Sequence, residues 1–248
     1  MRTYERFLAL SLLALLSGCA CPEGGHGEAG QGKSMAGKKA MADKQAMGPK
    51  YDSERYVAEA DAADDKLRRF EFADMPSNQP TGQVLVAAEG EEAEFVDAAR
   101  QPVRLSDFRG KPLVLVFARG FVGWVCPYCS TYTAQIAHSY DRIKALGAQV
   151  LLVYPAESDD LEILQQFTDA VNEILTEEGD AAVPFPVALD PGLKSTRRFN
   201  LLGDLSRPST FVLDAQGTIQ YAFVGETPDE RPAVSRIVEE LEALRAGE

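Results

Sequence analysis

Apolar positions in the second half of the chain alternate between strand-like runs and helix-like spacing. The segment 94–105 reads as a hairpin, and Leu113–Phe117 is a continuous apolar run that suits a buried central strand. A further strand is predicted at 149–154. The segment from 210 to 224 has the pattern of a second hairpin, with its turn at 214–217.

Helical spacing follows the strands. Apolar residues recur every three or four positions over 136–146, where Gly147 is expected to end the helix, and again over 161–174 and 234–244. Strands and helices alternate first, and a hairpin and a last helix follow. This order predicts an α/β fold: a central mixed sheet with helices on both faces.

The N-terminal residues have the pattern of an export signal. Arg2 and Arg6 flank an apolar run at 7–16 that is too short to span a bilayer. The string from Leu16 to Cys19 resembles the lipobox of bacterial lipoprotein signal peptides, which implies removal of residues 1–18 and lipidation of Cys19. The alternative is an ordinary secretory signal with a chance cysteine.

Either signal predicts an extracytoplasmic protein. The lipobox reading predicts a lipid anchor in the bacterial membrane. In lipoproteins of this kind, a residue other than Asp after the lipidated cysteine, here Ala20, usually implies the outer membrane, facing the periplasm of a Gram-negative host.

Between this signal and the strands, residues 19–81 are predicted to form a flexible tether, because 20–50 are rich in Gly, Ala, Lys and Met without apolar periodicity. A thin apolar stripe suggests a helix at 53–71. Residues 27–34 spell a Walker A string, but no strand precedes it and no helix follows it, so no nucleotide site is expected. The folded domain is predicted to cover 82–248.

Charge and cysteine context exclude other classes of site. The net charge of -13 argues against nucleic acid as a partner. Cys19 and Cys21 lie in the N-terminal region, which leaves one Cys-x-x-Cys pair, whereas a zinc site needs four ligands. His138 lies about 13 Å along the expected helix from Cys129 and half a revolution round, too far to act as a ligand or base. We expect no metal and no cofactor.

The pair Cys126 and Cys129 carries the predicted chemistry. The string Cys126-Pro127-Tyr128-Cys129 stands between a buried strand and a helix. The amides and dipole at a helix N-terminus stabilise a thiolate, and cysteines in such motifs have pKa values of about 3.5 to 7.5. We therefore predict that Cys126 attacks a disulfide and Cys129 resolves the mixed disulfide.

Three stretches resemble the alkyl hydroperoxide reductase/thiol-specific antioxidant family of the thioredoxin-like superfamily. They are 105–111, 113–129 with Arg119, Gly120 and Trp124, and 207–214, and the resemblance covers roughly 82–246. It implies a thioredoxin-like fold and a cis bond before Pro208, which would face the cysteines.

Three residues near the pair have predicted roles because of their positions in the chain. Arg119 would stabilise a thiolate or peroxide, or else form a surface ion pair. Trp124 would pack beside the motif or serve as a core aromatic. Tyr128 is expected to be exposed to partner proteins.

The sequence departs from this family at the reactive motif. Typical members carry Pro-x-x-x-Thr/Ser-x-x-Cys. Counting back from Cys126 gives Gly123 and Arg119, and from Cys129 gives Cys126 and Val122, so neither register supplies the proline or the hydroxyl.

We therefore expect, first, a membrane-anchored thiol-disulfide oxidoreductase. It would act on disulfide-bearing proteins and receive electrons from an unidentified thiol donor. The alternatives are a thiol peroxidase acting on hydroperoxides and a non-catalytic lipoprotein that serves as a binding module with an inert disulfide.

Overall fold

The computed structural model describes residues 70–85, 93–121, 123–203 and 205–247, all within the compact unit 47–248. The predicted signal peptide at 1–18, Cys19, Cys21, the Walker A string and most of the tether lie outside the described residues. No helix among the residues described is both long enough and apolar enough to cross a bilayer.

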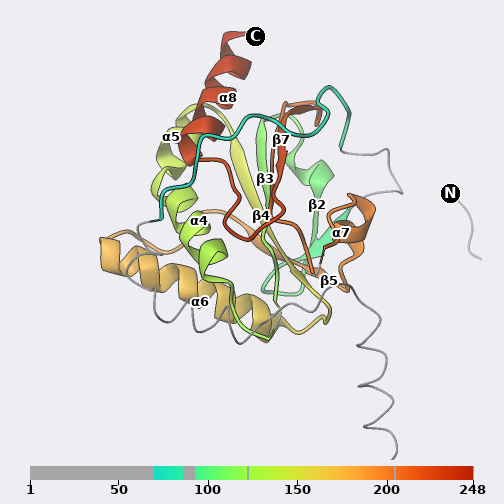
Figure 1. The fold of residues 1–248 in the computed structure, drawn as a ribbon, viewed down its shortest axis with the longest axis vertical. Helices are drawn as coiled ribbons and strands as arrows, with labels where there is room; N and C mark the ends of the chain where they lie inside the picture. The colour runs from blue at the N-terminus through green and yellow to red at the C-terminus, as the bar shows by residue number, and fades with distance from the viewer. Residues whose placement is uncertain (1–69, 86–92, 122, 204, 248) are drawn as a thin grey trace, which may run out of the picture. The chain divides into compact units, whose positions relative to one another are not determined.

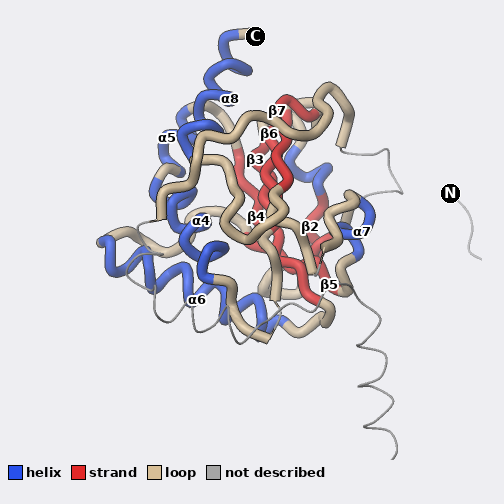
Figure 2. Tube along the Cα trace, viewed as in Figure 1, coloured by secondary structure: helices blue, strands red, loops and turns tan. Residues whose placement is uncertain are grey.

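A seven-stranded mixed sheet forms the centre of the fold (Figures 1 and 2), which confirms the predicted fold class. Its order is β2-β1-β5-β4-β3-β6-β7; β3 pairs parallel with β4 and β4 with β5, and the other pairs are antiparallel. The strands are β1 Glu94–Val96, β2 Pro102–Arg104, β3 Leu113–Phe117, β4 Gln149–Ala156, β5 Val187–Pro191, β6 Ser209–Leu213 and β7 Ile219–Val224.

The helices divide unequally between the two faces. They are the 3-10 helix η2 Leu105–Phe108, α4 Pro127–His138, α5 Tyr140–Ala145, α6 Leu161–Glu178, α7 Lys194–Arg198 and α8 Val234–Ala246. Helices α4, α5, α6 and α8 cover one face and share a buried cluster with Val114 and Val116 of β3. Leu105 of η2 and Phe199, directly after α7, pack on the opposite face.

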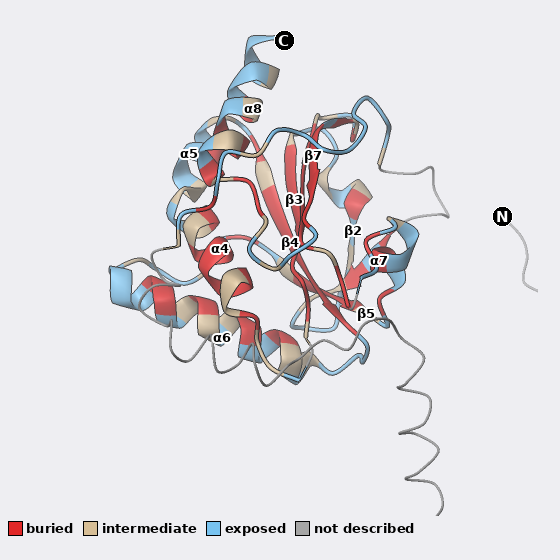
Figure 3. Ribbon diagram, in the orientation of Figure 1, coloured by how far each residue is buried: buried red, intermediate tan, exposed pale blue. Residues whose placement is uncertain are grey.

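Strand β3 shows why the sheet is buried on both sides. Its five apolar residues alternate between the two clusters, and all of them are buried (Figure 3). Such a run is typical of a central strand with both faces covered.

The helix predicted over 136–146 is divided in two. The first helix, α4, ends at His138, and α5 begins at Tyr140. Ser139 joins them with φ -92° and ψ 3°, although its N–H still bonds to the Gln135 carbonyl. Gly147 follows α5 with φ +82°, as expected of a residue that ends a helix.

Residues 70–81 belong to the folded domain rather than to the tether. Phe72 is buried in the core, and Ser77 Oγ donates to the Ala222 carbonyl at 2.9 Å. Asn78 bonds to both the N–H and the C=O of Val224 at 2.9 Å. The folded domain therefore begins before residue 82, where it was predicted to start. The prediction missed residues 70–81 because these contacts leave no periodic pattern of apolar residues. Of the helix predicted at 53–71, residues 53–69 lie outside the described part, and Phe70 and Glu71 are not helical.

Strand β5 and helix α7 were not predicted. Asp190, near the end of β5, is fully buried. Its carboxylate accepts hydrogen bonds from the N–H groups of Ser195 and Thr196 and from the Thr196 hydroxyl, at 2.8 to 2.9 Å. One buried acid thus holds α7. Neither element was predicted, because a short apolar run before an acid is a weak signal in the sequence.

Gly120 provides a test of the loop that follows β3. Its φ is +96°, and a Cβ there would overlap the Pro155 carbonyl oxygen and approach Leu205 Cδ2 to 2.8 Å. Gly147 has a similar φ, but a Cβ there would meet no atom within 4 Å. We expect Gly120→Ala to lower the free energy of unfolding by about 1–3 kcal/mol more than Gly147→Ala, measured by urea denaturation. Equal losses in the two variants would contradict this packing.

Candidate active site

The two cysteines lie where the chain enters α4. Cys126 is the N-cap residue with extended backbone (φ -71°, ψ 118°), and Pro127 occupies the first turn, where it forfeits no helical hydrogen bond. Cys129 lies one turn in, and its N–H donates to the Cys126 carbonyl at 3.0 Å. Both cysteines are free thiols, and each is 1% exposed.

Two donors converge on the sulfur of Cys129. The backbone N–H of Arg119 donates to Cys129 Sγ at 3.3 Å, and Nη2 of Arg231 donates to the same atom at 3.1 Å. Arg119 follows β3, whereas Arg231 lies between β7 and α8, 102 residues from Cys129. Segments far apart in the sequence thus meet at one sulfur.

Arg231 is a buried cation. It is 1% exposed, its Nε donates to the Pro228 carbonyl at 3.0 Å, and its guanidinium lies 5.3 Å from the ring centre of Tyr132. Among the described residues, no carboxylate forms an ion pair with Arg231. A buried charge is costly without a counter-ion, so the Cys129 thiolate is its natural partner.

This environment separates the acidities of the two thiols. Burial raises the pKa of Cys129, but a hydrogen bond with Cys126, the charge of Arg231 and the Arg119 backbone N–H outweigh it and lower that pKa from 9.0 to about 6. Burial, together with the hydrogen bond and charge of Cys129, raises the pKa of Cys126 well above 9.0. These pKa directions favour Cys129 as the thiolate and Cys126 as the thiol, whereas the motif alone predicts Cys126 as the attacking residue.

The other predicted site residues lie around this pair. Arg119 is buried rather than at the surface, and its charge, like its backbone N–H, lowers the pKa of Cys129. Trp124 is half-buried in the loop before the motif. Tyr128 is half-buried rather than exposed, because Phe70 packs edge-on against its ring at 5.1 Å.

Pro208 immediately precedes β6. The strand that follows it contacts α4, where the hydroxyls of Thr210 and Tyr132 are 3.2 Å apart. This brings the start of β6 against the helix that carries Cys129. The cis form of the bond before Pro208 stays a prediction.

His138 lies at the opposite end of α4 from the thiols, as the spacing predicted. It is 68% exposed, and its Nδ1 lies 2.8 Å from Asp180 Oδ2. The bond to Asp180 and its charge raise the pKa of His138. Glu178 completes a solvent-exposed group with these two side chains, so His138 contributes to a surface cluster and not to the thiol site.

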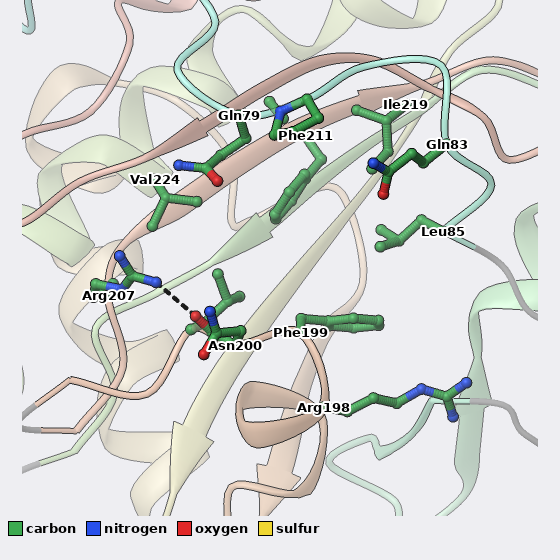
Figure 4. A pocket seen from close by; sticks show the side chains of 13 residues that line it. Gln79, Gln83, Leu85, Arg198, Phe199, Asn200, Arg207, Phe211, Ile219 and Val224 are labelled. Carbon is green, nitrogen blue, oxygen red and sulfur yellow. Dashed lines mark hydrogen bonds between the residues drawn. The ribbon is translucent and has the colours of Figure 1, made fainter.

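A separate pocket of about 290 Å³ opens on the other face of the sheet (Figure 4). Its apolar wall includes Phe199, Phe211 and Val224, and Arg207 at its rim donates to the Asn200 carbonyl at 2.6 Å. Neither cysteine lines it. The thiol chemistry therefore belongs to the buried end of α4 rather than to this pocket.

Sequence reasoning missed Arg231 and Tyr132. Arg231 lies in a short polar segment, Pro-Asp-Glu-Arg-Pro, which has no chemical motif. Tyr132 follows the helical pattern of α4 and has the signature of any core aromatic. Nothing local in the sequence indicates that Arg231 contacts Cys129 and lies over the Tyr132 ring.

Known proteins share both the sequence pattern and the fold. The model of the AhpC/TSA family matches residues 86–222. The chloroplastic peroxiredoxin Q of Triticum aestivum is 27% identical over 139 residues, covering 54% of this chain and 57% of the relative. That of Sedum lineare is 27% identical over 135 residues, covering 54% of this chain and 66% of the relative. The matches therefore span less than two thirds of these relatives.

Solved structures of low identity have the same fold. Mycobacterium bovis AhpC aligns with a TM-score of 0.53 at 19% identity, covering 70% of this chain and 96% of that one. Enterococcus faecalis AhpC aligns with a TM-score of 0.51 at 20% identity, covering 68% and 92%. The family model spans more than half of the chain, including β3, both thiols and β6, and this protein thus belongs to the AhpC/TSA family, with a peroxiredoxin-like thioredoxin fold.

Proposed function

We propose that this protein is a thiol peroxidase in which Cys129 attacks the hydroperoxide and Cys126 resolves the product. The observation that carries the proposal is the contact of buried Arg231 with Cys129 Sγ at 3.1 Å. A cation there keeps the sulfur ionised near neutral pH, and the thiolate is the form that reacts with peroxide.

Burial of the pair favours a small oxidant. Exchange with a protein disulfide requires a second sulfur to approach the attacking one, and here both sulfurs belong to residues only 1% exposed. Hydrogen peroxide and small hydroperoxides need far less space. Disulfide exchange through Cys126 is therefore the second candidate. An inert binding module is disfavoured, because it gives no reason to bury the charge of Arg231.

The reaction balances with the two thiols and one external donor. The Cys129 thiolate attacks one peroxide oxygen, the O–O bond breaks, and the other oxygen takes up a proton and leaves as water or alcohol. Cys129 is then a sulfenic acid. The Cys126 sulfur attacks it, an S–S bond forms and water leaves; a dithiol donor returns two electrons.

The departure from the family motif is consistent with these roles. In the register of Cys129, Cys126 stands where typical members carry the Thr or Ser hydroxyl. Its thiol, whose pKa lies well above 9.0, donates a hydrogen bond to the Cys129 thiolate as that hydroxyl would. One side chain would therefore both support the thiolate and resolve the sulfenic acid.

Single cysteine variants distinguish the two roles. Cys129→Ser should abolish peroxide consumption, because the attacking sulfur is lost. Cys126→Ser should consume about one peroxide per protein, accumulate sulfenic acid and then stop, because no neighbour closes a disulfide. Peroxide consumption and the dimedone labelling of sulfenic acid are measured for each variant. Sulfenic acid on Cys126 in the Cys129→Ser protein would reverse the assignment.

The pH profile tests the role of Arg231. With the Cys129 pKa at about 6, the rate of peroxide reaction should rise with pH through that value and level off above it. Arg231→Met should move the midpoint upward and lower the rate at pH 7 by roughly tenfold or more, since less thiolate is present. The control is Arg236→Met, which removes an exposed pair with Asp74. An unchanged midpoint in Arg231→Met would contradict the proposed role.

We also propose that the protein is anchored to the bacterial membrane by lipid on Cys19, as the lipobox-like string supports. The wild-type protein should then fractionate with membranes, and Cys19→Ala should appear in the soluble fraction. Cys21→Ala is the matched control and should stay with membranes. Release of both variants, or of neither, would count against lipidation at Cys19.

A further inference from the structure

Tyr154 of β4 lies beside the loop that contacts the reactive sulfur. The Ala118 N–H donates to the Val153 carbonyl at 2.9 Å, and the Phe121 N–H donates to the Pro155 carbonyl at 3.0 Å. These two bonds flank Tyr154 on β4. Arg119, whose N–H contacts Cys129 Sγ, lies between the two donors. Tyr154 and both cysteines belong to the same buried cluster.

The hydroxyl of Tyr154 is buried without a partner. The residue is 0% exposed, and its ring stacks on Phe167 of α6 with centroids 4.3 Å apart. Among the described residues, no group hydrogen-bonds to this hydroxyl. Tyr132 and Tyr221, in the same cluster, bond through their hydroxyls to Thr210 and to the Met75 carbonyl. A buried, unsatisfied donor costs stability, and this hydroxyl is therefore free to bond to an acceptor that arises only in another state of the protein.

Electrostatics connects this hydroxyl with the thiol pair. Burial raises the pKa of Tyr154, and the charge on Cys129 and then on Cys126 raises it further. The hydroxyl therefore keeps its proton throughout the neutral range. It is suited to donate a hydrogen bond and unsuited to act as a base.

We propose that the Tyr154 hydroxyl donates a hydrogen bond to the oxygen atom that peroxide leaves on Cys129. This inference rests on the proposed peroxidase function. Attack by Cys129 sulfur breaks the O–O bond and forms an S–O bond, which adds an acceptor that the reduced state lacks. When Cys126 forms the S–S bond, the ionised oxygen takes up two protons, the one that the sulfenic acid released and the one from the Cys126 thiol, and departs as water.

The hydrogen bond would act only in the oxidised intermediate. Its formation breaks no existing hydrogen bond, because the hydroxyl has no partner in the reduced protein. By drawing electron density onto the sulfenate oxygen, it makes the sulfur a weaker nucleophile toward a second peroxide. Tyr154 therefore protects Cys129 from oxidation to sulfinic acid while Cys126 approaches.

The test uses the full chain with Cys126→Ser, which holds the sulfenic acid, with and without Tyr154→Phe. Titration with hydrogen peroxide, followed by mass spectrometry, gives the concentration that converts half of Cys129 to sulfinic acid. We expect Tyr154→Phe to lower it about tenfold, the factor that one hydrogen bond to a charged acceptor supplies. Tyr221→Phe, which removes a bonded hydroxyl, should leave it unchanged.

Stability of the reduced protein supplies a second readout. Tyr154→Phe removes only an unpaired hydroxyl and should leave urea unfolding unchanged or shift it to higher urea, whereas Tyr221→Phe should shift it to lower urea. A reduced Tyr154→Phe protein that is less stable, or equal sulfinic acid formation with and without the hydroxyl, would overturn the inference alone. If the Cys126→Ser protein forms no sulfenic acid with peroxide, the proposed function fails as well.

Discussion

The contact between buried Arg231 and Cys129 sulfur determines the chemistry of this site. A guanidinium cannot lose its charge at any ordinary pH, so a fully buried one must find an anion or weaken the fold. Here the anion is a thiolate, with the Arg119 backbone N–H as a second donor. The same contact lowers the pKa of Cys129 and thereby leaves Cys126 as the protonated partner.

The fold brings these groups together from four segments. Strand β3 leads to Arg119, the first turn of α4 carries both thiols, and the connection before α8 supplies Arg231. The fourth segment, residues 70–72, covers the motif from outside, where Phe70 meets Tyr128. The thiols and Arg231 are thus buried together, where charges act with less screening by water than at the surface.

Local patterns predicted much of the fold and part of the site. The apolar run of β3, the stripe of α6 and the hairpin of β6 and β7 are visible in short windows, and so is the Cys-x-x-Cys pair. Helix position alone favours Cys126 as the attacking sulfur, whereas the contact that lowers the pKa of Cys129 comes from Arg231, 102 residues away. The packing of residues 70–81 and the unpaired hydroxyl of Tyr154 likewise depend on residues far apart in the chain, which no short stretch of sequence reveals.

The most direct measurement compares two oxidants on the same reduced protein at pH 7. Equal concentrations of hydrogen peroxide and glutathione disulfide are added in parallel, and formation of the Cys126–Cys129 disulfide is followed by quench and mass spectrometry. The account predicts much faster oxidation by peroxide, because a small molecule reaches the buried Cys129 thiolate. Faster oxidation by glutathione disulfide, with glutathione first attached to Cys126, would contradict it.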